Sequence, residues 1–329
     1  MRRLILLSVI CCLIPMFLGG CGSRTAADAK TKTIAVIPKG TTHEFWKSVH
    51  AGAQQAAKEF NLNIIWKGPL KEDDREQQIA LVEGFISSGA AGIVLAPMDD
   101  TALRAPVAAA TRQGIPVVIF DSGLKSEDYV SFVATDNYRG GEMAGEHMAR
   151  LLSGKGRVIL MRYQEGSDST NRREQGFLDA MKNHPQITIV SANQYGGPTT
   201  ETAYRAGENL LAPYKDAQGN LTIDGIFCPN ESTTFGMLRA LQDGGFAGKV
   251  RFIGFDTSAK LESALRQRQI NALILQNPRR MGYLAVKTLT DHMKGLQVPK
   301  KIDTGATLVT AENADQPEIK ALLTPDFQP

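Results

Sequence analysis

The strongest constraint on the fold is a strand, a helix and a second strand that follow one another within residues 224–258. An apolar run comes first, Ser232 then provides a cap for an amphipathic helix, and a second apolar run follows two glycines. Such a unit is almost always right-handed, so its two strands are parallel. Asn230 and Asp256 follow the two strands directly. We therefore expect them to lie together at one edge of a parallel sheet, where open α/β sheets bind ligands.

The end of this unit has an earlier counterpart. Residues 116–122 and residues 252–258 each contain an apolar run that ends in Phe-Asp. A serine follows the aspartate directly in the first segment and after one threonine in the second. Asp121 thus corresponds to Asp256, which predicts two similar α/β halves with an acid at a strand end in each. The alternative is that Asp-Ser is ordinary loop chemistry after a strand. An amide and a carboxylate in one crevice suit a polyhydroxylated ligand.

The first 20 residues have the pattern of an export signal. Two arginines precede an apolar core at 4–18, which is short for a membrane span. Leu18-Gly19-Gly20-Cys21 resembles a bacterial lipobox, so we expect residues 1–20 to be a lipoprotein signal peptide and Cys21 to be lipidated. A plain secretory signal with a chance cysteine is the alternative. Residues 21–32 are small and polar and are interpreted as a tether.

Composition excludes several classes of function. The chain of 329 residues carries 37 basic and 34 acidic side chains, and without Arg2 and Arg3 the basic count is 35, so a nucleic-acid partner is not expected. Beyond the leader and Cys21, Cys228 is the one cysteine left, which allows no intramolecular disulfide. The sequence has no nucleotide-binding glycine motif, and its five histidines lack metal-ligand spacing. We therefore expect neither a cofactor nor a metal.

The rest of the chain alternates strands and helices, as in a doubly wound parallel sheet. Strands are expected at 33–37, 62–66, 92–96, 116–120, 129–134, 158–161, 187–192, 225–228, 250–255, 272–275 and 307–310. Helices are expected near 43–60, 73–86, 99–113, 138–152, 170–181, 200–211, 232–243, 260–266 and 279–293. The acidic run 72–74 is interpreted as a solvated helix start. A polar tail is expected at the C-terminus.

Residues 33–311 resemble the periplasmic sugar-binding proteins of ABC importers, the ribose- and galactose-binding group that shares its fold with LacI-type repressors. Each matching segment is short, but their order and spacing persist over most of the chain. The segments are Phe45-Trp46, Gly52-Ala53-Gln54, Ala96-Pro97, Phe120-Asp121, Thr135-Asp136-Asn137, Gly140-Gly141, Arg173-Glu174-Gln175-Gly176-Phe177, Asn230, Gly254-Phe255-Asp256 and Gln276.

The resemblance implies a type I periplasmic binding protein, with two similar α/β lobes of doubly wound parallel sheet joined by a three-strand hinge. It places the N-terminal lobe at residues 33–135 plus 277–304. The C-terminal lobe is then 136–276 plus 305–315, and 316–329 is the tail. The three crossings between lobes are expected near Thr135, Gln276 and Gly305.

The resemblance also implies roles for individual residues around a sugar. An aromatic pair in the first loop faces the apolar side of the ring, and polar side chains of both lobes bind its hydroxyls. The implied ligand-binding residues are Phe45, Trp46, Asp121, Arg173, Asn230, Asp256 and Gln276.

Two departures from the family pattern bear on specificity. His43-Glu44 stands where the family has Asn-Pro, and Ser122 stands where the ribose binder has an arginine beside the first-lobe acid. Ribose itself is therefore not the expected ligand. Lys39, His43 and Ser122 are candidate additional ligand contacts, and Tyr195 is a candidate for the aromatic residue of the second lobe.

The expected function is an exported receptor, anchored at a membrane of the cell envelope through Cys21 and facing the periplasm. It would capture a monosaccharide or related polyol as a monomer and present it to an ABC permease with its ATPase. One alternative is a nucleoside or furanone receptor on the same fold. Another is a sensor subunit that serves a chemoreceptor or a histidine kinase. An enzyme is the weakest reading, because Asp121 and Asp256 have no evident nucleophile or metal partner.

Overall fold

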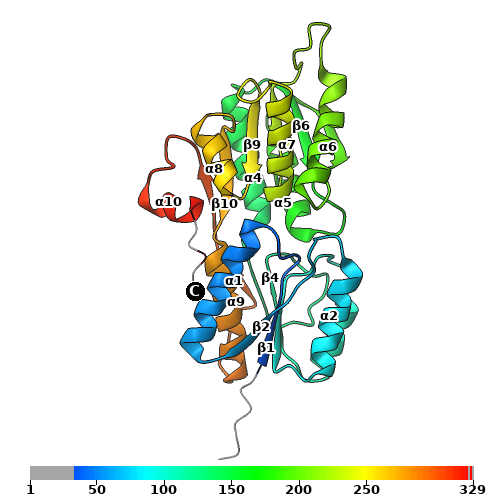
Figure 1. Cartoon of the computed structure of the whole chain (residues 1–329), viewed down its shortest axis with the longest axis vertical. Helices are drawn as coiled ribbons and strands as arrows, with labels where there is room; N and C mark the ends of the chain where they lie inside the picture. The colour runs from blue at the N-terminus through cyan, green and yellow to red at the C-terminus, as the bar shows by residue number, and fades with distance from the viewer. Residues whose placement is uncertain (1–32, 325–326, 328–329) are drawn as a thin grey trace, which may run out of the picture. The chain divides into compact units, whose positions relative to one another are not determined.

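Two β-sheets of six strands each organise the part of the chain that the computed structural model describes, residues 33–324 and 327 (Figure 1). Each sheet is covered by helices on both faces and forms one lobe. The predicted fold class, two α/β lobes of mainly parallel sheet, is confirmed. The predicted signal peptide, the lipidation site Cys21 and the tether lie outside the described residues.

The sheet of the first lobe has the strand order β11-β5-β4-β3-β1-β2, and all of its neighbouring strands are parallel. Its strands are β1 (Thr33–Ile37), β2 (Asn63–Trp66), β3 (Gly92–Leu95), β4 (Val117–Phe120), β5 (Ser131–Ala134) and β11 (Lys301–Asp303). The central strands β3 and β4 are short apolar runs that are buried throughout, as strands covered on both faces require.

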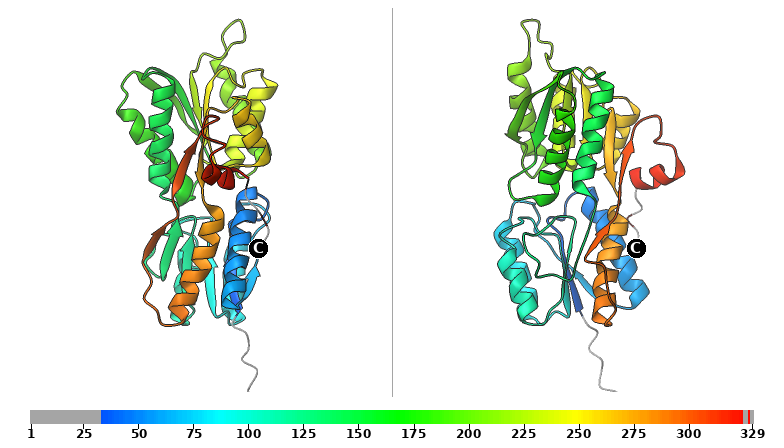
Figure 2. Two further views of the ribbon diagram at one scale, coloured as in Figure 1. Left: turned by 90° about the vertical axis from the view of Figure 1, so that its left-hand side faces the viewer. Right: turned by 180° about the vertical axis from the view of Figure 1, so that it is seen from behind.

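Side chains that alternate along these strands enter two separate cores. One core packs under the helices α1 (Glu44–Phe60) and α9 (Pro278–Met293) and takes Val94 and Val118 from the sheet. The other lies under α2 (Arg75–Ser87) and α3 (Arg104–Arg112) and takes the neighbours Ile93 and Ile119. Figure 2 shows α1 and α9 side by side on one face of this lobe, although they are far apart in the sequence.

The sheet of the second lobe has the order β12-β10-β9-β8-β6-β7, and β12 is antiparallel to β10. Its strands are β6 (Gly156–Arg162), β7 (Ile187–Tyr195), β8 (Gly225–Phe227), β9 (Arg251–Phe255), β10 (Ala272–Gln276) and β12 (Ala306–Val309). The helices α4 (Asn137–Leu151) and α5 (Asp168–Lys182) cover one face. The other face carries α6 (Thr200–Leu211), α7 (Glu231–Asp243), α8 (Ala259–Arg266) and α10 (Pro317–Leu323), with a 3-10 turn at Ala212–Tyr214 after α6.

The predicted strand-helix-strand unit is β8-α7-β9, and its two strands are parallel neighbours. The helix begins two residues earlier than expected. Asn230, not Ser232, is its N-cap, and the Asn230 side-chain oxygen accepts a hydrogen bond from the Thr233 N–H at 3.2 Å. This cap fixes the orientation of the Asn230 side chain at the carboxyl end of β8.

The chain passes between the two lobes three times, after β5, after β10 and between β11 and β12. The expectation of a polar tail is wrong for the segment that forms α10, because Ile319 and Leu323 are buried in the core of the second lobe. Within residues 33–324 and 327, no helix combines the length and the apolar character that a membrane crossing requires.

Candidate functional site

One cavity brings together side chains from the carboxyl ends of strands and the first turns of helices in both lobes. Its volume is about 30 Å³, close to that of a single water molecule. A ligand of more than a few atoms would need the two lobes to move apart in order to enter. The lining residues are Lys39, His43, Phe45, Trp46, Glu72, Asp121, Tyr163, Ser169, Thr170, Arg173, Asn230, Glu231, Asp256 and Gln276.

Asp121 and Asp256 occupy matching positions in the two lobes. They follow β4 and β9, both are buried, and both have left-handed backbones, with φ of 61° and 66°. Each backbone N–H donates to a carbonyl of the neighbouring strand, that of Val133 at 3.0 Å and that of Ile274 at 2.9 Å. A positive φ is uncommon outside glycine and is found mainly at turns and functional sites. The repeat in the sequence therefore corresponds to a repeat in backbone geometry.

Lys39 connects the first-lobe acid to the second lobe. Its ammonium forms an ion pair with Asp121 at 3.1 Å. It also donates to the hydroxyls of Ser167 and Ser169, which lie at the start of α5, at 3.3 and 3.0 Å. Lys39 is 3% exposed, so its charge is buried and needs these partners. The side chain also lines the cavity.

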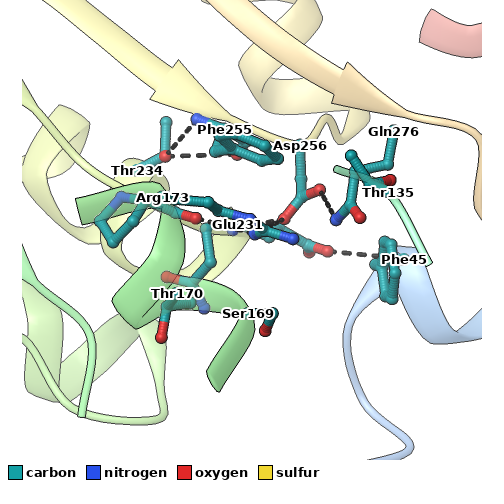
Figure 3. A network of polar contacts seen from close by, with 12 residues as sticks. Phe45, Thr135, Ser169, Thr170, Arg173, Glu231, Thr234, Phe255, Asp256 and Gln276 are labelled. Atoms are coloured by element: carbon teal, nitrogen blue, oxygen red, sulfur yellow. Dashed lines mark hydrogen bonds and ion pairs between the residues drawn. The ribbon is translucent and has the colours of Figure 1, made fainter. Parts of the chain in front are cut away.

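The second-lobe acid is held by donors on three sides. Gln276 Nε2 donates to Asp256 Oδ1 at 2.8 Å, the Glu231 N–H donates to Oδ2 at 3.2 Å, and the Arg173 guanidinium lies 3.8 Å from Oδ2 (Figure 3). Burial raises the pKa of Asp256, and the charge of Arg173 and the Gln276 hydrogen bond oppose that rise. The carboxylate is thus fixed in position while its charge is only partly compensated by the protein.

Arg173 is placed by close helix packing as well as by hydrogen bonds. A Cβ on Gly141 of α4 would lie 2.0 Å from the Arg173 carbonyl oxygen, so only glycine allows α4 to approach α5 this closely. The guanidinium donates to Asn137 Oδ1 and to the Pro229 carbonyl, both at 2.8 Å, and lies 3.9 Å from the centre of the Phe255 ring. Burial lowers the pKa of Arg173, although nearby carboxylates counteract this.

Glu72 accepts three side-chain hydrogen bonds at the centre of the site. His43 Nδ1 and Trp46 Nε1 lie 2.7 Å from Oε1, and the Tyr163 hydroxyl of the second lobe donates to Oε2 at 2.8 Å. Burial lowers the pKa of His43, but the charge and hydrogen bond of Glu72 outweigh burial and raise it to about 9. Burial likewise raises the pKa of Glu72, yet His43 and Lys39 bring it down to about 2. The two side chains therefore form an ion pair at neutral pH.

Glu231 joins the second lobe to the start of α1 in the first. Its carboxylate accepts hydrogen bonds from the backbone N–H groups of Glu44 and Phe45, at 3.3 and 3.1 Å. The N-terminus of a helix attracts negative charge, because its first N–H groups have no partner within the helix. Burial raises the pKa of Glu231 to about 7, although the charge of His43 and the Phe45 N–H oppose the rise.

The aromatic side chains give the cavity an apolar wall. The rings of Phe45 and Trp46 meet edge to face with their centres 4.9 Å apart, and the Trp46 ring also packs against Phe120 in the core. The site thus combines aromatic surface with closely spaced donors and acceptors, the pattern that suits a ligand with C–H faces and a hydroxyl rim. Among the residues the structure describes, no three His, Cys, Asp or Glu side chains are grouped to hold a metal ion.

Comparison with known proteins identifies the family. A family described as "Periplasmic binding protein domain" matches residues 34–297, which is most of the chain. The chain belongs to this family of periplasmic binding proteins. The ribose import binding protein of Haemophilus influenzae is 29% identical over 291 residues, covering 88% of this chain and 95% of the relative. The D-allose-binding periplasmic protein of Escherichia coli is 28% identical over 272 residues, covering 80% and 85%.

Solved structures of solute-binding proteins share the fold over nearly their whole length. One from Agrobacterium radiobacter, in complex with D-arabinose, has a TM-score of 0.85 and 32% identity, covering 91% of this chain and 100% of that one. Another from Agrobacterium vitis, with bound D-fucose, has a TM-score of 0.83 and 34% identity, covering 89% and 100%. This periplasmic binding protein therefore has the two-lobed architecture of proteins that were crystallised with sugars.

The structure brings nearly all of the predicted site residues of this periplasmic binding protein to one place. Nine of the ten line the cavity, namely Phe45, Trp46, Asp121, Arg173, Asn230, Asp256, Gln276, His43 and Lys39. Ser122 is fully buried next to the cavity, and its hydroxyl oxygen accepts a hydrogen bond from the Ser169 N–H at 3.1 Å. Their roles in ligand binding remain predictions.

Tyr195, the candidate for the aromatic residue of the second lobe, does not line the cavity. It is 39% exposed and lies under the guanidinium of Arg162, 5.0 Å from ring centre to Cζ. Tyr163, which directly follows β6, lines the cavity instead. The rule that ligands bind at the carboxyl ends of parallel strands would have pointed to Tyr163.

The sequence interpretation missed Glu72, Ser169, Thr170 and Glu231 as well as Tyr163. Glu72 was interpreted as part of a solvated helix start, which is wrong because it is 6% exposed and accepts three hydrogen bonds. Ser169 and Thr170 lie in the first turn of α5, and Glu231 begins α7. Their positions at helix starts facing the sheet edge were the available signal.

Proposed function

We propose that this chain is the solute-binding component of an ABC importer, which captures a monosaccharide or related polyol between its lobes and delivers it to the permease. The single observation that carries the proposal is the pair Asp121 and Asp256. These acids lie in matched left-handed conformations, one in each lobe, and line the same cavity as the aromatic residues Phe45 and Trp46. A ligand held by both acids joins the two lobes, so binding and closure are one event.

The roles of the side chains follow from their chemistry. Asp121 and Asp256 accept hydrogen bonds from ligand hydroxyls, while Arg173 and Lys39 donate, and charged partners strengthen both kinds of bond. The ring of Phe45 faces the C–H side of the ligand. The relatives named as ribose- and allose-binding proteins, and the structures with bound D-arabinose and D-fucose, support a sugar of this size. The proposal assigns no catalytic step to any of these residues.

Delivery to a transporter implies a place in the cell as well as a ligand. We propose that residues 1–20 direct export, that lipidated Cys21 anchors the protein to a membrane, and that residues 21–32 allow the lobes to reach the permease. The import function in the names of the relatives supports this arrangement over an independent sensor.

A calorimetric and scattering experiment tests the clamp. After a thermal-shift screen of monosaccharides and polyols, Asp121→Ala and Asp256→Ala should each weaken binding of the best ligand by about tenfold or more, since a hydrogen bond to a charged group contributes about 1.5–3 kcal/mol. Each should also lose most of the ligand-induced compaction in small-angle scattering. Glu83→Ala, an exposed carboxylate of α2, is the matched control and should behave as the wild type. Normal binding and compaction in either aspartate variant contradicts the proposal.

A further inference from the structure

A second, smaller cavity lies directly against the ligand site. Phe45, Asp256 and Gln276 line both cavities, so the two cavities are neighbours. The second cavity extends from them to Ser48 of α1, to Thr257 after β9 and to Leu322 of α10. Its volume is about 20 Å³, room for one water-sized group. The apolar side chain of Leu322 contributes to its wall.

Buried polar atoms without hydrogen-bond partners gather in this cavity. In residues 33–324 and 327, four buried side-chain nitrogen or oxygen atoms lack a partner, and three of them belong to residues that line it. These are Ser48 Oγ, Thr257 Oγ1 and Gln276 Oε1. Ser48 is 1% exposed and Gln276 is 4% exposed, so bulk water does not satisfy them. Because buried polar groups are nearly always paired, their convergence indicates a binding position.

Gln276 connects the two cavities chemically. The nitrogen of its amide donates to Asp256 Oδ1 at 2.8 Å on the side of the ligand site, and its amide oxygen is the unpaired atom. Figure 3 shows Asp256 and Gln276 joined in this way, with Phe45 nearby. A group bound in the second cavity would therefore contact the side chain that positions the second-lobe acid.

The available atoms define the group that fits. The two hydroxyls can donate or accept, whereas the amide oxygen of Gln276 only accepts, so the bound group must carry at least one donor. A methyl group would leave all three atoms unpaired. A carboxylate would place negative charge against the Gln276 oxygen and beside Asp256. A hydroxyl on a single carbon that reaches in from the main cavity places one water-sized oxygen in this space, supplies the donor and adds no charge.

We propose that this cavity is a subsite of the ligand site that receives one hydroxyl-bearing carbon, such as the hydroxymethyl group that distinguishes a hexopyranose from the pentopyranose with the same ring configuration. The inference rests on the proposed function, since it assumes a sugar in the main cavity. It adds a specificity: Ser48, Thr257 and Gln276 select ligands with that extra group.

The test compares matched sugar pairs by isothermal titration calorimetry. The pairs are D-ribose with D-allose, L-arabinose with D-galactose, and D-xylose with D-glucose, which differ within each pair by one hydroxymethyl group. In whichever ring configuration binds, the hexose should bind at least tenfold more tightly than the pentose. In the galactose series D-fucose, which carries a methyl in place of the hydroxymethyl, should bind no better than L-arabinose.

Variants assign the preference to this cavity. Ser48→Ala and Thr257→Val each remove one hydroxyl, and each should lower hexose affinity at least fivefold while pentose affinity stays within twofold. Thr257→Val preserves side-chain shape, so a folding defect in Ser48→Ala leaves the inference testable. Ser87→Val, an exposed helical serine of α2, is the control and should change neither affinity.

The outcomes distinguish failure of the subsite from failure of the proposed function. If sugars bind but hexoses have no advantage, or if the advantage survives in both variants, the subsite is wrong and the cavity holds only water. If no sugar in these three series binds, the subsite fails, whereas the proposed function fails only if the broader screen of monosaccharides and polyols also finds no ligand.

Discussion

Replacing Glu72 by glutamine tests whether this carboxylate holds His43 in its charged form. Glu72→Gln keeps the size of the side chain but removes the charge that lies 2.7 Å from His43 Nδ1. Burial acts to lower the pKa of His43, and the charge and hydrogen bond of Glu72 are the largest opposing contributions. In the variant, the pKa of His43 should therefore fall from about 9 to below its usual value of 6.5.

The magnitude follows from the pKa. A value of about 9 instead of 6.5 corresponds to roughly 3 kcal/mol in favour of the charged imidazole, and His43 is only 14% exposed, so solvent screens little of it. This contribution is fully present below pH 6.5 and is lost as the pH rises through about 9. Because the pKa of Glu72 is lowered to about 2, its contribution is present above pH 4.5 and is lost as the pH falls through about 2.

The variant should therefore be destabilised most between pH 4.5 and pH 6.5, and the difference from wild type should shrink above pH 9. Chemical denaturation in each of these two pH ranges measures the difference in unfolding free energy between the variant and the wild type. An NMR titration of the imidazole, assigned with His43→Gln, measures the pKa itself. The control is Glu76→Gln, an exposed acid in the first turn of α2, which should alter neither. If His43 titrates at the same pH in Glu72→Gln and wild type, the reasoning is refuted.

Three further predictions concern the anchor, the aromatic wall and the contact between lobes. Cys21→Ser should release the protein from membranes or leave its precursor uncleaved, and normal cleavage with membrane retention would contradict the lipid anchor. Trp66 is the other tryptophan of the chain, so the fluorescence of Trp46 is measured in a Trp66→Phe background. Ligand should change that fluorescence, whereas an unchanged spectrum would assign Trp46 to the core alone. Burial raises the pKa of Glu231 from 4.5 to about 7, so burying this carboxyl on closure should take up a proton, and the contact between lobes should weaken as the pH rises across that range. Glu231→Gln should reduce this pH dependence of compaction in scattering, and an unchanged profile argues against it.

Local patterns in the sequence predicted most of the fold. The strands β3 and β4 are apolar runs between polar turns, and burial on both faces makes such runs easy to recognise. The strand β11 has the sequence Lys-Ile-Asp, with one apolar residue, and it exists because β5 offers a parallel partner. The helix α10 has seven residues, too few for helical periodicity to be detected, and packing against the second lobe stabilises it.

The site residues that follow a strand were predictable from the sequence. Those that are buried by contacts between distant segments were not. Asp121 and Asp256 follow apolar strands, so the rule for parallel sheets finds them. Glu72 is buried because Trp46 and Tyr163, 26 residues before it and 91 residues after it, converge on its carboxylate. Glu231 bonds to backbone N–H groups 186 and 187 residues earlier in the chain. No local pattern carries these contacts, because they join segments far apart in the chain, and all but that of Trp46 with Glu72 join the two lobes.

The passage of the chain between lobes affects how the protein is made. The core of the first lobe includes Met281, Ala285 and Leu289 of α9, and its sheet is completed by β11 at residues 301–303. Chains fold from the N-terminus as the ribosome extends them, but here the first lobe lacks one layer of its core until nearly the whole polypeptide has emerged. The leader proposed at residues 1–20 would thus have most of the time of translation in which to engage an export channel, which accepts an unfolded chain, before the first lobe is complete.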